Sequence, residues 1–427
     1  MLITAALPCT LGDVACDSSP SAKQSATLDR ETAQSAYDFT NSVGVNTHIN
    51  YFDCTYGNFA MLERELKSIG ILHLRDGIHL QNADYNQAVY GRWIELGKLG
   101  IRFDAVLDPR SNLPPVTTAM LENVNALAGH TIESFEGPNE LDISGIEDWP
   151  TVDRNYQGTI YNSAKSVAAA RSIQVVGPSL AFASHASELG DISDRVDEIN
   201  LHPYPSAKVP SAIFPEQIEL AKMMSSDKQI IFTETGYHNA LNDHHDQPAV
   251  SETAAAKYIP RLFLEDFARG ISRTYLYEFM DEKSDPGLID NQLHWGLIRA
   301  DGSEKPAFLA LKNLSTELQD SIQPMHLQQL SWTLSTNDTQ VHHLLLQKSN
   351  GVFDLVLWHE EPSYDPNRRI DLDNPKLATV LKLGQQAQRV AIYEPSVQSP
   401  PLKSYTDTAS VPLEIPDSPL VVEISPQ

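Results

Sequence analysis

The sequence has few basic residues for its size. It contains 31 lysines and arginines against 56 aspartates and glutamates, so the formal net charge of its 427 residues is −25 at pH 7. Nucleic acids and anionic membrane surfaces are bound by clustered basic side chains, which this composition does not favour. No apolar run approaches the roughly 20 residues that cross a bilayer. We therefore predict no nucleic-acid partner and no membrane span.

Cysteine is also scarce. Cys9, Cys16 and Cys54 are too few for a disulfide framework, and the odd count leaves open whether Cys9 and Cys16 pair. The first 16 residues are mostly apolar, and no basic residue precedes Lys23, which is typical of an export leader that lacks its basic part. We predict that residues 1–26 form a leader or a disordered segment. We also predict export to the periplasm or the cell exterior.

Glycine-rich phosphate-binding turns are missing, because neither G-x-G-x-x-G nor G-x-x-x-x-G-K-[S/T] occurs. This absence disfavours a doubly wound sheet, the alternative fold for a chain in which strands and helices alternate. Eight short apolar runs are typical of parallel strands that are covered on both sides. They span residues 42–50, 71–78, 101–109, 132–140, 173–180, 197–205, 229–237 and 271–282.

Helical patterns separate these runs. Apolar residues recur at helical spacing in the segments 59–70, 156–172, 214–228, 251–270 and 305–319. Eight predicted strands with helical segments between them match the (β/α)8 TIM barrel in number and length. We predict an α/β fold with this barrel over residues 27–320. Whether residues 27–41 cap the barrel or lend a strand to the next domain stays open.

The spacing of apolar residues changes from about residue 325 onward. Short apolar runs are separated by Pro, Asn, Asp and Gly, a spacing that predicts antiparallel strands. These runs cover residues 341–349, 351–360, 378–384, 388–395 and 420–425. We predict a C-terminal β-sandwich domain over residues 321–427.

Polar side chains collect where the predicted barrel strands end, which is where barrel enzymes carry their chemistry. Glu140 and Glu234 end the fourth and seventh strands. These strands lie on opposite sides of the barrel, so we expect the two carboxylates to face each other across its mouth. Exposed carboxylates are common, so either glutamate alone is weak evidence for a functional site. Their joint position at the ends of the fourth and seventh strands is the stronger indication.

Two facing carboxylates meet the chemical need of glycosidic bond hydrolysis. One carboxylic acid protonates the leaving oxygen, and the other carboxylate stabilises or attacks the oxocarbenium-like carbon. At a separation of about 5 to 5.5 Å the second carboxylate acts as a nucleophile, and the anomeric configuration is retained.

The motifs FEGPNE and IIFTETGY resemble the strand-four and strand-seven motifs of clan A glycoside hydrolases, which are retaining (β/α)8 enzymes. The resemblance spans residues 42–315. It implies that Glu140 is the general acid/base, that Glu234 is the nucleophile and that Asn139 donates to the sugar 2-hydroxyl. In HLRDG it implies an arginine, Arg75, that steadies the nucleophile. In LHPYP it implies that His202 and Tyr204 lie beside the same carboxylates.

Two departures from the clan pattern leave the particular family open. Leu141 and Asp142 follow the Asn-Glu pair, where many members have proline. The eighth strand, YLYEFMDE, lacks the tryptophan that many relatives use as a sugar platform, and Trp295 can take this role. We expect substrate binding by a set of residues near the strand ends, namely His48, Asp76, Asp108, Tyr237, Tyr277, Glu278 and Trp295.

Three functions compete on this fold. The leading one is a retaining glycoside hydrolase that acts on a poly- or oligosaccharide and needs no cofactor and no metal. A catalytically silent carbohydrate-binding barrel is the second, although it predicts the loss of one glutamate. A metal-dependent hydrolase needs converging His and Asp residues, and the fifth strand, ending in GPSL, supplies none. The DHHD motif at 243–246 is a weak metal candidate, because adjacent residues rarely converge on one ion. The sugar, the linkage, endo or exo action and the oligomeric state stay open.

Overall fold

The computed structural model describes residues 29–80, 83–112, 115–166, 172–244 and 247–427. The predicted leader, with Cys9 and Cys16, lies outside these residues, as do two residues of the DHHD motif. Within the described segments no helix combines the length and the apolar character needed to span a membrane.

A closed barrel of eight parallel strands forms the larger part of the protein, as the sequence predicted. Each strand pairs with its sequence neighbours, and the last strand closes the ring by pairing with the first. The strands are β3 (Val43–Asn46), β4 (His73–Gly77), β5 (Arg102–Val106), β6 (Ile132–Glu136), β7 (Gln174–Val176), β8 (Glu198–Leu201), β9 (Gln229–Thr235) and β10 (Thr274–Leu276).

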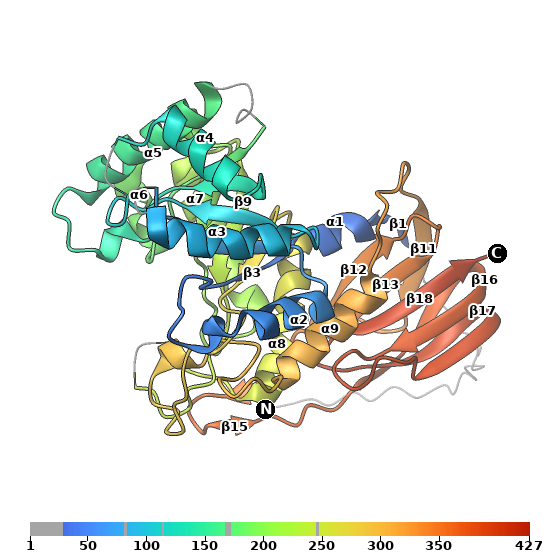
Figure 1. Cartoon of the computed structure of the whole chain (residues 1–427). Coiled ribbons are helices and arrows are strands. Elements are labelled where there is room, and N and C mark those ends of the chain that lie inside the picture. Colours follow the sequence, from blue (N-terminus) through green and yellow to red (C-terminus); the bar gives the residue numbers. More distant parts are fainter. Residues whose placement is uncertain (1–28, 81–82, 113–114, 167–171, 245–246) are drawn as a thin grey trace, which may run out of the picture.

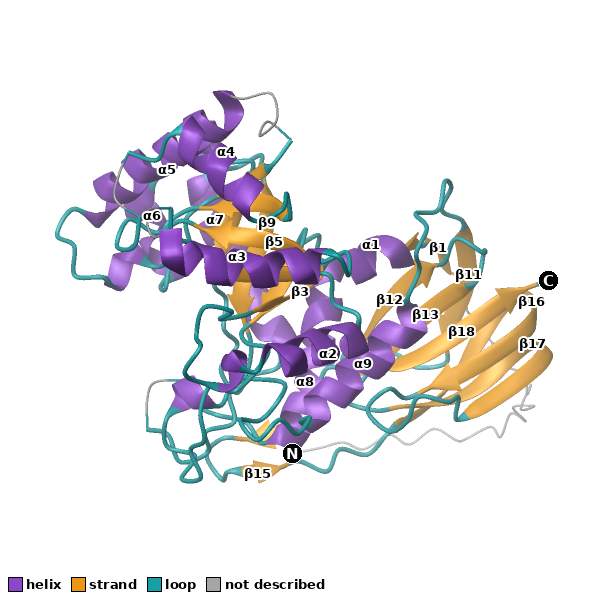
Figure 2. Cartoon of the chain, viewed as in Figure 1, coloured by secondary structure: helices purple, strands orange, loops and turns teal. Residues whose placement is uncertain are grey.

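Helices follow the strands and surround the barrel (Figures 1 and 2). They are α2 (Phe59–Ile69), α3 (Ala83–Gly97), α4 (Thr118–Leu127), α5 (Trp149–Ser166), α6 (Ala186–Leu189), α7 (Phe214–Met224), α8 (Glu252–Ala268) and α9 (Pro306–Leu318). The helix α1 (Ala36–Asn41) precedes the first barrel strand. Short 3-10 turns occur as η1 (Thr55–Gly57), η2 (Leu141–Ile143), η3 (Ala183–His185), η4 (Ser193–Arg195), η5 (Pro210–Ile213) and η6 (Asn291–Leu293).

Local sequence explains where these helices begin and end. The Asn58 side chain accepts a hydrogen bond from the backbone of Met61 and caps the start of α2, while Gly70 ends that helix with a φ of 79°. Ser251 caps α8 in the same way by accepting from Ala254. The predicted helices 59–70, 214–228, 251–270 and 305–319 are therefore present with small shifts at their ends. The sequence patterns did not identify α3 and α4.

A second sheet, antiparallel in most of its pairings, fills the C-terminal region, as predicted. Its strand order is β1-β11-β16-β18-β13-β12-β2, and β17 pairs with β16. The strands are β1 (Asp29–Thr32), β2 (Gln34–Ser35), β11 (Gln329–Leu334), β12 (Val341–Gln347), β13 (Phe353–His359), β16 (Leu377–Tyr393), β17 (Lys403–Ile415) and β18 (Leu420–Pro426). A separate two-stranded ribbon pairs β14 (Tyr364–Asp365) with β15 (Ile370–Asp371).

The second sheet differs from its prediction in one long strand. The runs 378–384 and 388–395 were expected as two strands, but β16 continues through both of them. The polar residues between these runs lie where the pairing with β17 shifts register, between Lys382 and Ala387. The alternation of apolar residues stops in this irregular, polar part of the strand, so the sequence pattern predicts a loop there.

The start of the described chain belongs to the second sheet. β1 pairs with β11 and β2 pairs with β12, so residues 29–35 lend strands to the C-terminal domain, which the sequence had left open. The two domains also share one apolar core, in which Val356 and Trp358 of β13 join residues of the barrel helices. Arg261 of α8, which is fully buried, pairs with Glu360 across this contact.

Candidate active site

A cavity of about 640 Å³ opens at the carboxyl ends of the barrel strands. Its walls come from loops that follow several different strands, as expected for this fold. Ten of the predicted site residues line it: His48, Arg75, Asp76, Asp108, Asn139, Glu140, Tyr204, Glu234, Tyr277 and Trp295.

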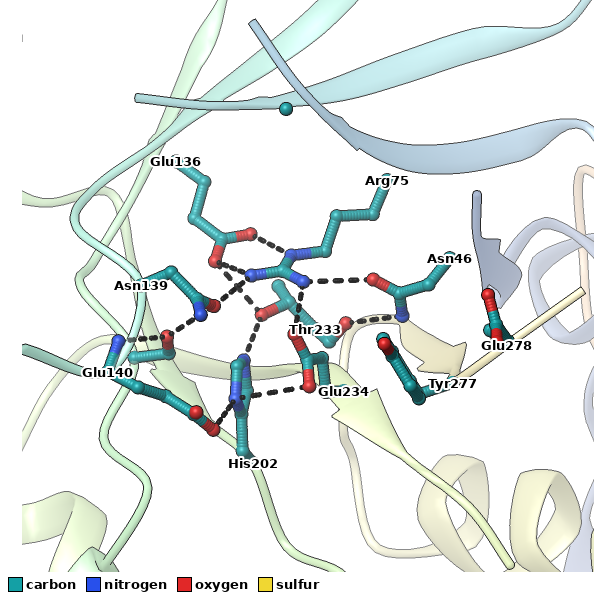
Figure 3. A network of polar contacts seen from close by, with 12 residues as sticks. Asn46, Arg75, Glu136, Asn139, Glu140, His202, Thr233, Glu234, Tyr277 and Glu278 are labelled. Carbon is teal, nitrogen blue, oxygen red and sulfur yellow. Dashed lines mark hydrogen bonds and ion pairs between the residues drawn. The ribbon is translucent and has the colours of Figure 1, made fainter. Parts of the chain in front are cut away.

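Glu140 and Glu234 face each other in this cavity, as the sequence predicted (Figure 3). One carboxylate oxygen of each and a ring nitrogen of His202 all lie within 4.8 Å of one another. Glu234 lies within β9, and its side chain is 12% exposed. Glu140 lies beyond β6, with a φ of 49°, and its side chain is 23% exposed.

Arg75 of β4 connects the polar groups at the base of the cavity (Figure 3). Its Nη1 atom donates to Glu234 Oε1 at 2.5 Å and to Asn46 Oδ1 at 2.9 Å. Its Nη2 atom donates to Asn139 Oδ1 at 2.7 Å. The guanidinium also binds Glu136 through two parallel hydrogen bonds of 2.8 and 2.7 Å. This forked geometry fixes the plane of the arginine and therefore the side of Glu234 that it contacts.

Glu136 was not predicted as a site residue. It is fully buried, and it also accepts hydrogen bonds from Asn200 and Thr233. Burial and the neighbouring Glu136 raise the pKa of Asp104 well above its usual range. The available signal was a carboxylate at the end of an apolar strand, directly before Gly-Pro. Its contacts with residues of other strands could be found only from the folded structure.

The surroundings of Glu234 favour its ionised form. Tyr204 donates its hydroxyl to Glu234 Oε2 at 2.8 Å, and His202 Nδ1 lies 3.6 Å from the same oxygen. Burial alone would raise the pKa of Glu234, but His202, Arg75 and Tyr204 outweigh it and lower that pKa. Opposite charge and donated hydrogen bonds both stabilise a carboxylate.

His202 joins the two glutamates. Its Nδ1 atom lies 2.8 Å from Glu140 Oε1, and its Nε2 atom lies 3.0 Å from the Thr233 hydroxyl. Burial opposes the charged imidazolium, but Glu234 and Glu140 outweigh burial and raise the pKa of His202. A proton on this ring is therefore within hydrogen-bonding distance of Glu140.

Aromatic rings form one wall of the cavity. Trp295 packs edge-on against Tyr204, with ring centroids 5.0 Å apart, and against Tyr277 at 6.0 Å. His48 stacks on Tyr51 at 4.7 Å, and burial lowers the pKa of His48 to about 4, so this ring is neutral at pH 7. The tryptophan expected in place of the missing strand-eight platform is thus present in the cavity.

Two residues expected to bind substrate lie outside the cavity lining. Tyr237 is buried against Tyr258 and donates its hydroxyl to the backbone oxygen of Lys208. Glu278 is fully buried and accepts a hydrogen bond from Tyr56. Burial raises the pKa of Glu278 well above its usual range, which favours its neutral form.

Two further aspartates line the cavity, but their carboxylates accept hydrogen bonds from the protein itself, mostly from backbone amides. Asp76 accepts hydrogen bonds from the Thr47 hydroxyl and from two backbone amides, and burial raises its pKa to about 7. Asp108 accepts from the Arg110 side chain and from the backbone amide of Asn139. Both residues therefore position the cavity wall.

Three groups of side chains among the described residues could hold a metal ion. They are Glu140 with His202 and Glu234, His48 with Glu278 and Glu282, and Glu265 with His342 and Glu360. The first group coincides with the facing carboxylates. A test of whether activity depends on a metal ion is therefore needed to distinguish a retaining glycoside hydrolase from a metal-dependent hydrolase. Of the DHHD motif, only Asp243 and His244 are described, and neither belongs to these groups.

Sequence reasoning also missed further residues of the cavity lining. Ile143, Phe182, Gln247, Asn291 and Gln292 line the cavity from loops and short turns. Such residues carry no periodic pattern in sequence, so their position follows only from the folded loops.

No family model and no curated protein sequence matches the chain. Solved structures do match it over nearly its whole length. The GH39 enzyme from Xanthomonas axonopodis pv. citri is 12% identical with a TM-score of 0.62, covering 93% of this chain and 96% of its own. A glucosidase from Croceicoccus marinus is 11% identical with a TM-score of 0.61, covering 93% and 97%. A monomeric beta-xylosidase from Caulobacter crescentus CB15 is 13% identical with a TM-score of 0.59, covering 92% and 98%. At these identities the likeness concerns the fold: this chain combines the barrel and the second sheet as those proteins do.

Proposed function

We propose that the protein is a retaining glycoside hydrolase that cleaves O-glycosidic bonds by double displacement. The observation that carries this proposal is the pair Glu140 and Glu234, whose nearest oxygens lie within 4.8 Å across one cavity. This spacing agrees with the roughly 5 to 5.5 Å expected where a carboxylate attacks the sugar directly, and not with the wider gap that admits a water. The solved structures that share the fold include a glucosidase and a beta-xylosidase, which supports the same class of reaction.

Glu234 is the nucleophile in this proposal. Arg75 and Tyr204 hold its two oxygens at 2.5 and 2.8 Å, so the carboxylate is ionised and fixed in place before substrate binds. It attacks the anomeric carbon as the leaving oxygen departs, and a glycosyl ester forms on Glu234. The ester neutralises the carboxylate, so its charged contacts with Arg75 become weaker in the intermediate.

Glu140 is the general acid and then the general base. In the first step it donates a proton to the leaving oxygen, and in the second it removes one from the water that attacks the ester. His202 lies at hydrogen-bonding distance from Glu140 and close to Glu234. Its ring can therefore interact with either carboxylate as the charge on each of them changes during the reaction. The greater exposure of Glu140 gives the leaving group and the water access to it.

Asn139 orients the sugar. Its Oδ1 atom accepts hydrogen bonds from Arg75 and from the Ser179 hydroxyl, so its amide nitrogen is turned away from both groups. That nitrogen is the donor that we assign to the sugar 2-hydroxyl. Trp295 and Tyr277 supply apolar surface for the face of the same sugar ring.

A screen of polysaccharides and aryl glycosides tests the proposal. We expect at least one class to be hydrolysed by the wild-type protein, with activity lost in Glu234→Gln. Glu219→Gln on α7 is the matched control, because that side chain is 71% exposed and pairs with Lys222 one turn further along the same helix. Binding of a saccharide without hydrolysis would instead indicate the catalytically silent barrel. We also propose export from the cytoplasm, which cell fractionation of the source organism tests.

A further inference from the structure

Phe182 is an exposed aromatic residue at the mouth of the cavity. Its side chain is 57% exposed, and it lines the cavity together with Ile143, which is 55% exposed. Aromatic side chains bury large apolar areas in most folded proteins, so a solvent-facing phenyl ring beside a cavity is available to a ligand.

Phe182 lies on the side of the cavity that carries Glu140. The strand ends β6 and β7 are bridged between Asn139 and Ser179, and the Glu140 amide donates to the Ser179 backbone oxygen at 3.1 Å. Phe182 follows Ser179 by three residues, and Ile143 follows Glu140 by three. Trp295 and Tyr277, which we assign to the sugar that reacts with Glu234, belong to a different wall.

Asp142 ties the Phe182 loop to the turn that carries Glu140. The carboxylate is buried, and it accepts hydrogen bonds of 3.0 Å from the backbone amides of Ala181 and Phe182. It also pairs with His185 Nδ1 at 2.9 Å. One side chain thus fixes both the backbone of Phe182 and the ring beside it.

The His185 ring packs against the Phe182 ring. The Phe182 and His185 rings meet edge-on, with centroids 5.4 Å apart, and His185 in turn lies 6.1 Å from the buried Trp149. An exposed side chain held in this way loses little conformational entropy when a ligand covers it, which favours binding.

We propose that Phe182, with Ile143, binds the ring of the leaving group, the part of the glycoside that departs when Glu140 donates its proton. The inference rests on the proposed glycoside hydrolysis. The ligand is a ring with an apolar face, supplied by a second sugar unit or by an aryl group. Asp142 is the positioning residue of this site.

The test compares leaving groups on the sugar identified by the screen. A disaccharide and an aryl glycoside carry a ring on the Glu140 side, whereas the glycosyl fluoride does not. We expect Phe182→Ala to lower the ratio of kcat/KM for the ring-bearing substrates to kcat/KM for the fluoride roughly tenfold. This is the effect of uncovering about 60 Å² of apolar surface. If this ratio falls for the disaccharide alone, the ligand is a sugar ring. If it falls for the aryl glycoside alone, the ligand is an aryl group.

Phe52→Ala is the matched control. Phe52 is also an exposed phenylalanine, 44% exposed, but it packs against Arg92 and is not among the residues that line the cavity. An unchanged ratio in Phe182→Ala, or an equal change in Phe52→Ala, would overturn the inference and leave the proposed hydrolysis intact. A wild-type protein that hydrolyses none of the glycosides would overturn both.

A double-mutant cycle tests the role of Asp142. If Asp142 acts through Phe182, Asp142→Ala lowers the same ratio, and adding it to Phe182→Ala causes little further change. Asp142→Asn, which keeps the size of the side chain but loses acceptor capacity, replaces Asp142→Ala if that variant does not fold. Fully additive effects of the two substitutions would contradict a positioning role.

Discussion

The two glutamates of the cavity differ in their surroundings. Glu234 lies within a barrel strand, is nearly buried and is held by Arg75 and Tyr204. Glu140 lies on a turn beyond its strand, is twice as exposed and contacts His202. A nucleophile has to be ionised and immobile, whereas an acid/base group has to exchange protons with groups that enter and leave. The difference in surroundings therefore predicts which glutamate performs which role.

The largest effect is expected at Glu234. Replacing it with alanine removes the group that forms the covalent bond, so kcat should fall on the order of 10⁵-fold, as in other enzymes that lose their nucleophile. The loss should be similar for good and poor leaving groups, because both need the ester. Steady-state rates with an activated aryl glycoside and an unactivated glycoside measure this. A much smaller loss with the activated substrate would assign acid catalysis to Glu234 instead.

Glu140→Ala should discriminate between the same two substrates. General acid catalysis contributes about 10² to 10⁴-fold, and an activated leaving group needs little protonation. We therefore expect a loss on the order of 10³-fold with the unactivated glycoside and a much smaller one in the first step with the activated glycoside. Added azide should partly rescue the variant by replacing water. Equal losses and no glycosyl azide product would remove Glu140 from this role.

Tyr204→Phe probes the hydrogen bond that holds Glu234. Its removal should lower kcat about tenfold, the value of one hydrogen bond to a charged group. The hydroxyl lowers the pKa of Glu234, so its loss raises that pKa. The acidic limb of the kcat/KM profile should therefore move to higher pH.

Tyr237→Phe is the matched control for Tyr204→Phe, because that hydroxyl contacts the Lys208 backbone away from the cavity. We expect unchanged kinetics in this variant. A shift of the pH profile in Tyr237→Phe, or none in Tyr204→Phe, would contradict the geometry of the nucleophile.

The smallest effect is expected from metal removal. Two carboxylates and an imidazole could bind an ion, but in the proposed mechanism they act as nucleophile, acid/base and their connecting group. Dialysis against EDTA should leave turnover unchanged. Activity that is abolished by EDTA and restored by one divalent ion would favour the metal-dependent hydrolase.

The barrel could be predicted from sequence because its strands are continuous apolar runs that end in polar residues. The facing of Glu140 and Glu234 followed from their strand numbers. The direction of side chains just beyond the strand ends could not be predicted, because the backbone there no longer follows the regular alternation of a strand. Tyr277 lines the cavity, while Glu278, one residue later, is buried outside it. The contacts of Glu136 with Arg75 and Asn200 join three strands that are far apart in sequence.

The most direct test of the central claim is to trap the covalent intermediate on Glu234. A 2-fluoro glycoside of the sugar found in the screen should inactivate the wild-type protein and add the mass of one glycosyl unit. Peptide mapping should find the label in the fragment that contains FTETGY, and NMR should show that the first-formed product keeps the substrate's anomeric configuration. An inverted product, or a label on Glu136, Glu278 or Asp281, would contradict the account.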